Sequence, residues 1–191
     1  MFTSQDNIRA FIERVARAFP NPGTLYLVGE CSLVVESVRK FCTEVIIALD
    51  VDAEYVGLLT RAVDEAAREV ELTVCIEHPE TVIPLPDSAR GGERRVSGLA
   101  DDTFGPLRIR HFDPYSVAIR FIARGDQPDY DLALALLTMG WIDIGILREK
   151  VDALLDSFSF DTIQQDPAEF RRKFKGLNQM WIAQHSNSDA A

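Results

Sequence analysis

Apolar positions in the first 112 residues change between helical and strand-like spacing. They recur at helical intervals after Ser4 and again after Asp52, which predicts two helices, each capped by that polar residue. A shorter helix is expected over 33–40. Runs rich in Val, Ile and Leu predict strands, at residues 24–28, 43–49, 72–77 and 107–112.

The pattern becomes helical throughout after Asp113-Pro114, a pair that suits the cap and the first position of a helix. It continues to about Gln184, with breaks at two glycines and one polar loop. An α+β fold is therefore predicted, with a mixed sheet flanked by helices. Its parts are an α/β core over 1–112, a helical region packed on it over 113–185, and a disordered tail over 186–191.

Composition points to one compact protein in a reducing compartment. The 191 residues are 47% hydrophobic, enough for a core without a metal or disulfide. The three cysteines lie in apolar runs without CxxC spacing, so reduced, buried thiols are expected. No apolar stretch approaches the ~20 residues of a membrane span. Since the start also lacks the features of a signal peptide, we expect a cytoplasmic protein without membrane association.

The net charge of -10 argues against general nucleic-acid binding, because phosphate backbones favour clustered Lys and Arg. A local basic group could still hold a smaller anion such as a triphosphate. The basic residues that cluster in the sequence are Arg90, Arg94, Arg95, Arg108, Arg110, His111, Arg120 and Arg124.

Two stretches carry a family resemblance: Leu27-Val28-Gly29-Glu30-Cys31-Ser32, and a strand that begins Thr43-Glu44-Val45-Ile46 and ends at Asp52. They resemble the active-site turn and strand of small bacterial nucleotidyltransferase-fold proteins of the DNA polymerase beta superfamily. The closest group is related to abortive-infection toxins, with approximately Val-Gly-Gly-x-Ser, a helix and Thr-x-Asp-Ile-Asp. Segments 111–116, 120–125 and 166–170 extend the resemblance over roughly residues 8–175.

The resemblance implies a nucleotidyltransferase-like fold and transfer of a nucleoside monophosphate from a nucleoside triphosphate to a hydroxyl. In such chemistry Mg²⁺ bridges strand carboxylates and the triphosphate, and a small turn approaches the phosphates closely. The implied roles would be Glu44 for catalysis and metal binding, Glu77 as a third carboxylate that also binds metal, and the Gly29 backbone with Ser32 for phosphate. Arg120 and Arg124, four residues apart on one predicted helix, would neutralise charge.

The sequence departs from the family pattern at two points. Ile46 occupies the position of the second strand carboxylate and cannot bind metal, and Glu30 replaces the second glycine of the turn. Asp50 and Asp52 lie too far along the strand to substitute. A degenerate active site is therefore predicted. We further hypothesise that Glu30 forms a salt bridge with Arg110, Arg120 or Arg124 where substrate would otherwise lie.

Each candidate residue also has a structural interpretation. Glu44 could be an exposed strand residue or the partner of an arginine, and Ser32 could cap a helix that begins at Leu33. Arg120 and Arg124 could pair with acidic neighbours instead of a ligand. His111, next to Asp113-Pro114, is expected to be structural.

Three functions remain open. The first is an active Mg²⁺-dependent nucleotidyltransferase that binds a nucleoside triphosphate. The second is a degenerate relative kept as an interaction module, or as one half of a toxin–antitoxin or defence pair, with a protein partner. The third is an unrelated α/β regulatory domain. The sequence does not indicate an oligomeric state.

Overall fold

The computed structural model describes residues 2–77, 92–100, 103–157 and 166–186, and has the predicted α+β architecture. These residues form two compact units, one within 1–113 and the other beginning at Pro114. The segment 78–91 and most of the tail predicted to be disordered, 187–191, lie outside the described residues.

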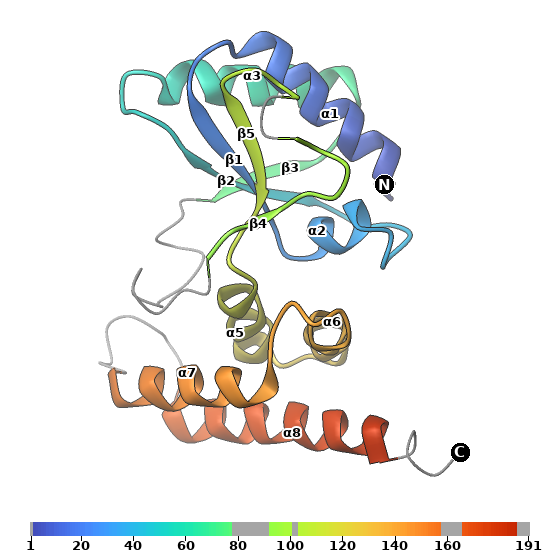
Figure 1. The fold of residues 1–191 in the computed structure, drawn as a ribbon, viewed down its shortest axis with the longest axis vertical. Helices are drawn as coiled ribbons and strands as arrows, with labels where there is room; N and C mark the ends of the chain where they lie inside the picture. The colour runs from blue at the N-terminus through green and yellow to red at the C-terminus, as the bar shows by residue number, and fades with distance from the viewer. Residues whose placement is uncertain (1, 78–91, 101–102, 158–165, 187–191) are drawn as a thin grey trace. The chain divides into compact units, whose positions relative to one another are not determined.

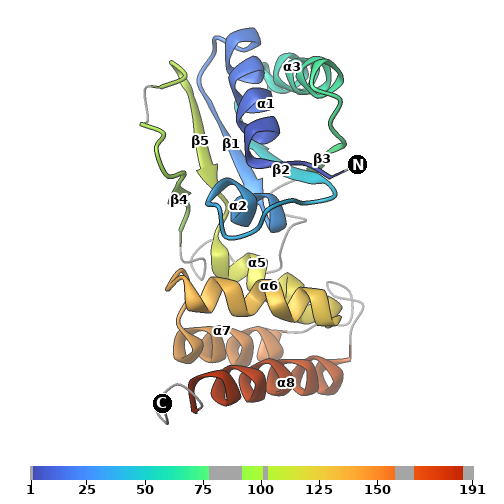
Figure 2. The same cartoon turned by 90° about the vertical axis from the view of Figure 1, so that its right-hand side faces the viewer.

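The first unit contains a five-stranded mixed sheet with helices packed on it (Figures 1 and 2). The strand order is β3-β2-β1-β5-β4, with β1 antiparallel to β2 and parallel to β5, and with β3 parallel to β2. In chain order the elements are α1 (Gln5–Ala18), β1 (Gly23–Val28), α2 (Glu30–Val35), β2 (Val45–Asp50), α3 (Val56–Glu69), β3 (Val74–Glu77), β4 (Arg94–Arg95) and β5 (Leu107–His111).

The core of this unit lies between α1, α3 and one face of the sheet. Alternation along β1 and β2 turns Leu25, Leu27, Val45 and Ile47 toward this face, where all four are fully buried. The buried residues of α1 recur at helical spacing and pack against them. Ser4 caps α1 as predicted, because its hydroxyl accepts a hydrogen bond from the Asn7 N–H. The cap predicted at Asp52 was wrong, since α3 begins at Val56 and its N-cap is Tyr55, without a side-chain hydrogen bond.

The opposite face of the sheet carries the residues of interest. Tyr26 and Val28 of β1 lie on it, beside Ala48 and Ile46 of β2. Thus the position of the expected strand carboxylate faces away from α1 and α3.

The second unit is helical, as predicted. It comprises α5 (Pro114–Arg124), α6 (Gln127–Thr138), α7 (Ile144–Ser157) and α8 (Pro167–Ser186). Pro114 is the first residue of α5, in agreement with the sequence pattern. In the parts of the chain that the structure describes, no helix has the length and apolar character needed to cross a bilayer.

Candidate functional site

The turn between β1 and α2 is built on a backbone conformation that favours glycine. Gly29 is the N-cap of α2 and has φ 75° and ψ -129°, a combination strained for residues with a Cβ. The helix begins at Glu30, so Ser32 lies within its first turn and is not a cap. The predictions of a helix over 33–40 and of a cap at Ser32 were therefore wrong.

The side chains of this turn bind to neighbouring strands. The Ser32 hydroxyl is 4% exposed and donates a hydrogen bond to the Leu27 carbonyl at 3.0 Å. The Cys31 thiol lies 3.3 Å from the Val28 carbonyl and 3.2 Å from the Ile46 carbonyl. These contacts explain the early start of α2, because they fix its first turn against the end of β1 and the start of β2.

The Ser32 hydroxyl and the Cys31 thiol both hold α2 against the neighbouring strands. The Ser32 hydroxyl proton already has a buried acceptor, so a phosphate would have to compete with the Leu27 carbonyl for it. Burial raises the pKa of the Cys31 thiol to about 12, which keeps it protonated and unreactive at neutral pH. Cys31, Cys42 and Cys75 are free thiols; the first two are buried, as expected, and Cys75 is half-buried.

Glu30 has a different partner from the one hypothesised. Its carboxylate lies 3.3 Å from Arg39 Nε, because the connection after α2 returns to the first turn of the helix. Arg110 pairs with Glu93 and Arg124 with Asp129. The hypothesis that Glu30 bridges to Arg110 or Arg124 was therefore wrong.

Glu44 lies immediately before β2 and is half-buried. Within the described part of the chain, no ion pair or hydrogen bond holds its carboxylate. Glu77 pairs in register with Ala48, which lies four residues after Glu44 along the chain. Four residues span roughly 13 Å of strand, so the structure does not bring these two carboxylates together.

The row of the sheet that contains Ile46 is apolar. Ile46 pairs in register with Val28 on β1 and with Cys75 on β3. Phe112 follows the last paired residue of β5 and lies next to Val28 in the same row. Phe112 donates its N–H to the Leu27 carbonyl at 2.9 Å and packs its ring against Tyr26 on the same face. Ile46 itself is half-buried.

These side chains do not fit a Mg²⁺ site. Mg²⁺ binds oxygen ligands in nearly octahedral geometry, usually with carboxylates from the protein. Ile46 and its register partners Val28 and Cys75 offer no carboxylate, and the described residues contain no group of three His, Cys, Asp or Glu side chains that could hold a metal. A cavity of about 400 Å³ next to the turn is lined by Glu30 and Thr43, but not by Ser32 or Glu44.

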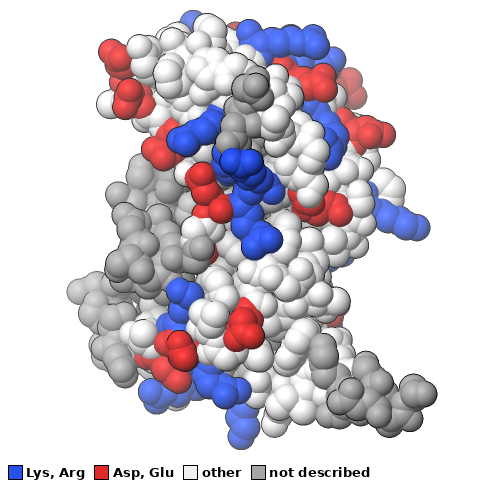
Figure 3. All heavy atoms as spheres, in the orientation of Figure 1, with Lys and Arg blue, Asp and Glu red and all other residues white. Residues whose placement is uncertain are grey.

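The basic residues on this face of the sheet are also engaged. The Arg110 guanidinium is buried and binds Glu93, which also accepts a hydrogen bond from the Tyr26 hydroxyl at 2.8 Å. Arg108 donates to the Thr24 hydroxyl at 3.0 Å. On the face drawn in Figure 3, Lys and Arg side chains lie among Asp and Glu side chains and do not form one continuous basic surface.

Arg120 and Arg124 belong to the second unit, on α5. Arg124 Nη2 lies 2.5 Å from an Asp129 carboxylate oxygen, and its guanidinium stacks over the Phe121 ring at 5.3 Å. Arg124 thus pairs with an acidic neighbour, which was the structural alternative for it. Arg120 is half-buried on the same helix.

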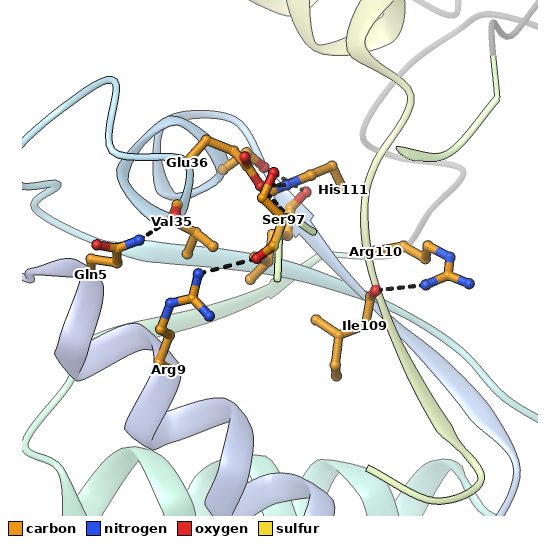
Figure 4. Close-up of polar contacts among 10 residues, drawn as sticks. Gln5, Arg9, Val35, Glu36, Ser97, Ile109, Arg110 and His111 are labelled. Atoms are coloured by element: carbon orange, nitrogen blue, oxygen red, sulfur yellow. Dashed lines mark hydrogen bonds and ion pairs between the residues drawn. The ribbon is translucent and has the colours of Figure 1, made fainter. Parts of the chain in front are cut away.

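The sequence interpretation missed a polar cluster at the other end of α2 (Figure 4). His111 Nε2 lies 2.8 Å from Glu36 Oε1, and the Ser97 N–H donates to the same oxygen at 2.8 Å. Arg9 of α1 donates to the Ser97 carbonyl, and Gln5 to the Val35 carbonyl. His111 is completely buried, in agreement with the structural role expected for it.

The ionisation of Glu36 follows from these contacts. Burial alone would raise the pKa of this carboxyl, but hydrogen bonds from His111 and Ser97 lower it to about 2. The pair joins positions 75 residues apart, so no local pattern could reveal it.

Comparison with models of protein families, with curated proteins and with solved structures gives no match for this chain. The resemblance to nucleotidyltransferase-fold proteins therefore remains a prediction from the sequence.

Proposed function

We propose that this chain is a nucleotidyltransferase-like protein in which nucleotidyl transfer is impaired or lost, and which acts as an interaction module. One observation carries the proposal: Ile46 and its register partners on the two neighbouring strands, Val28 and Cys75, provide no carboxylate. Transfer from a triphosphate depends on metal ions that neutralise charge and activate the attacking oxygen. None of these three side chains offers an oxygen ligand for such an ion.

The surrounding turn supports the same conclusion. Glu30 adds a carboxylate where the family pattern has a glycine, and it remains 27% exposed beside Arg39. Its charge would repel a triphosphate at the turn. The Ser32 hydroxyl, which the resemblance assigns to phosphate, is buried and bound to a backbone carbonyl.

One observation favours the active alternative. The Glu44 carboxylate has no ionic partner among the described residues, so it could serve as one metal ligand. A single carboxylate makes a weak Mg²⁺ site, because Mg²⁺ retains its waters unless several ligands replace them. We therefore rank this alternative second.

Thermal melts with each nucleoside triphosphate, in the presence and absence of Mg²⁺, test the proposal. A ligand that binds only the native state raises its stability by mass action, so binding appears as a higher melting temperature. We expect no Mg²⁺-dependent rise for the natural chain. A reproducible rise of several degrees would contradict the proposal.

A variant that restores the family pattern sharpens the test. Ile46→Asp combined with Glu30→Gly should gain Mg²⁺-dependent stabilisation by a triphosphate. Ile76→Asp is a matched control, since Ile76 lies on β3 and faces the other side of the sheet, with 37% exposure. A gain in the control as well, or none in a folded double variant, would show that the Ile46 row is not the site.

A further inference from the structure

Three large apolar side chains are exposed on two short segments of the first unit. Phe2 is 74% exposed, Phe41 49% and Val38 42%. Val38 and Phe41 belong to the connection between α2 and β2. Exposed apolar side chains that gather in this way mark interaction sites more often than scattered ones do.

The backbone holds the two aromatic residues in place. Thr3 and Cys42 form an isolated β-bridge, with N–H to carbonyl distances of 2.8 and 3.1 Å, and both residues are buried. The rings of Phe2 and Phe41, which adjoin this bridge, have centroids 6.1 Å apart and planes tilted by 48°. An aromatic pair fixed in this way loses little conformational entropy when a partner binds.

A cavity of about 400 Å³ lies beside these rings, and its charges are predominantly positive. Arg39 contributes a guanidinium that is paired with Glu30 at 3.3 Å. Lys40 is exposed, and no carboxylate of the described chain pairs with it. The residues that line the cavity are Phe2, Glu30, Arg39, Lys40, Phe41, Cys42 and Thr43.

We propose that this aromatic–basic patch (Phe2, Arg39, Lys40 and Phe41) binds an acidic segment of a partner protein that carries a large apolar side chain. The apolar side chain would pack against the ring pair, while carboxylates of the segment would lie near Lys40 and Arg39. This inference rests on the proposed role as an interaction module, and it names the surface and the chemistry of the partner.

A nucleotide fits the patch less well than a peptide. A triphosphate concentrates its charge on adjoining groups, yet here it would meet one unpaired cation, Lys40, beside the Glu30 carboxylate. A peptide distributes its carboxylates along an extended chain. Its apolar side chains can also cover the ring pair.

Fluorescence polarisation with the full chain tests this proposal. The probe is a labelled synthetic peptide in which Leu and Phe alternate with Asp and Glu. One control peptide has Lys in place of the acidic residues, and another has Ser in place of the apolar ones. We expect only the acidic–apolar peptide to bind, with an affinity that falls as salt rises.

Substitutions locate the binding surface. Phe41→Ser should weaken binding at least about tenfold, as expected for a central aromatic contact, and Lys40→Glu should weaken it by a similar factor. Leu58→Ser on α3 is the matched control, since Leu58 is also 49% exposed but lies outside the patch. This variant should bind like the natural chain.

Several results would overturn the inference. These are no binding of the acidic–apolar peptide, an equal loss in Leu58→Ser, or preference for the Lys-containing peptide. Binding of Mg²⁺–ATP that Phe41→Ser abolishes would indicate a nucleotide site instead. A nucleotidyl-transfer assay separates the two proposals: transfer activity refutes the proposed function, whereas lack of peptide binding without transfer refutes the docking surface alone.

Discussion

The two ends of α2 use their polar groups differently. At the N-terminal end, the Cys31 thiol and the Ser32 hydroxyl lie against backbone carbonyls of β1 and β2, while Glu30 forms a partly exposed pair with Arg39. At the C-terminal end, Glu36 accepts two hydrogen bonds from residues distant in sequence, and its side chain is only 9% exposed.

The expected site lies at the N-terminal end of α2, whereas the contacts that contribute most to stability lie at its C-terminal end. A buried carboxylate is tolerated only with strong partners, and Glu36 has them in His111 and Ser97. The N-terminal end contributes neutral hydrogen bonds, each of which adds about 1 kcal/mol. The short helix is therefore anchored mainly where no catalytic motif was expected.

The largest effect is expected from His111→Ala. Removal of the imidazole leaves the Glu36 carboxylate nearly buried beside an apolar gap, and breaking such a pair costs about 3 kcal/mol or more. Urea unfolding measures this loss. Glu69→Ala, which removes the exposed partner of Arg14, should change stability by less than about 1 kcal/mol.

A double-mutant cycle with Glu36→Ala distinguishes the pair from a simple cavity. The two residues should show a coupling of at least about 1 kcal/mol, since they touch directly. Additive losses would mean that the pair does not stabilise the C-terminal end of α2.

Low pH should weaken the contacts of Glu36 at the C-terminal end of α2 and so lower the stability of the fold. Because the pKa of Glu36 is lowered from 4.5 to about 2 in the folded chain, its contribution to stability is complete above pH 4.5 and is lost as pH falls toward 2. The free energy of unfolding should fall more steeply over this range for the natural chain than for Glu36→Gln. Parallel pH curves for the two proteins would contradict this assignment.

A smaller loss is expected at the N-terminal end. Ser32→Ala removes one neutral, buried hydrogen bond to Leu27 and should cost about 1 kcal/mol in urea unfolding. Ser37→Ala, an exposed hydroxyl beyond the other end of α2, is the control and should cost less. If Ser32→Ala left stability unchanged but altered binding of a triphosphate, the hydroxyl would have a ligand role that we do not assign to it.

The smallest effect belongs to Glu30→Gln. The pair with Arg39 is partly exposed on both sides, so its loss should change the free energy of unfolding by less than about 1 kcal/mol. Thermal melts at low and high salt should nearly coincide for this variant and the natural chain. A larger effect would indicate that Glu30 has a structural role beyond this ion pair.

The sequence predicted most of the fold because its apolar spacing is regular. The helix after Ser4, the strands β1, β2, β3 and β5, and the change at Pro114 all follow from local patterns. The bounds of α2 did not, since they depend on the positive φ of Gly29 and on hydrogen bonds from Cys31 and Ser32 to other elements. Such contacts between distant segments have no local signature.

The candidate site was predicted in part. The turn at Gly29 does lie against the start of β2, through the Cys31 contact with the Ile46 carbonyl. Glu44 and Glu77 were not brought together, because the register of β3 places Glu77 beside Ala48. The partner of Glu30 was missed because it depends on the path of the connection after α2, which apolar spacing does not determine.

The central claim is that the row around Ile46 cannot support metal-dependent nucleotidyl transfer. Incubation of the chain with α-labelled nucleoside triphosphates and Mg²⁺, with protein and RNA acceptors present, measures transfer directly. We expect no incorporation above that of a Glu44→Gln variant. Mg²⁺-dependent incorporation by the natural chain that Glu44→Gln abolishes would contradict it.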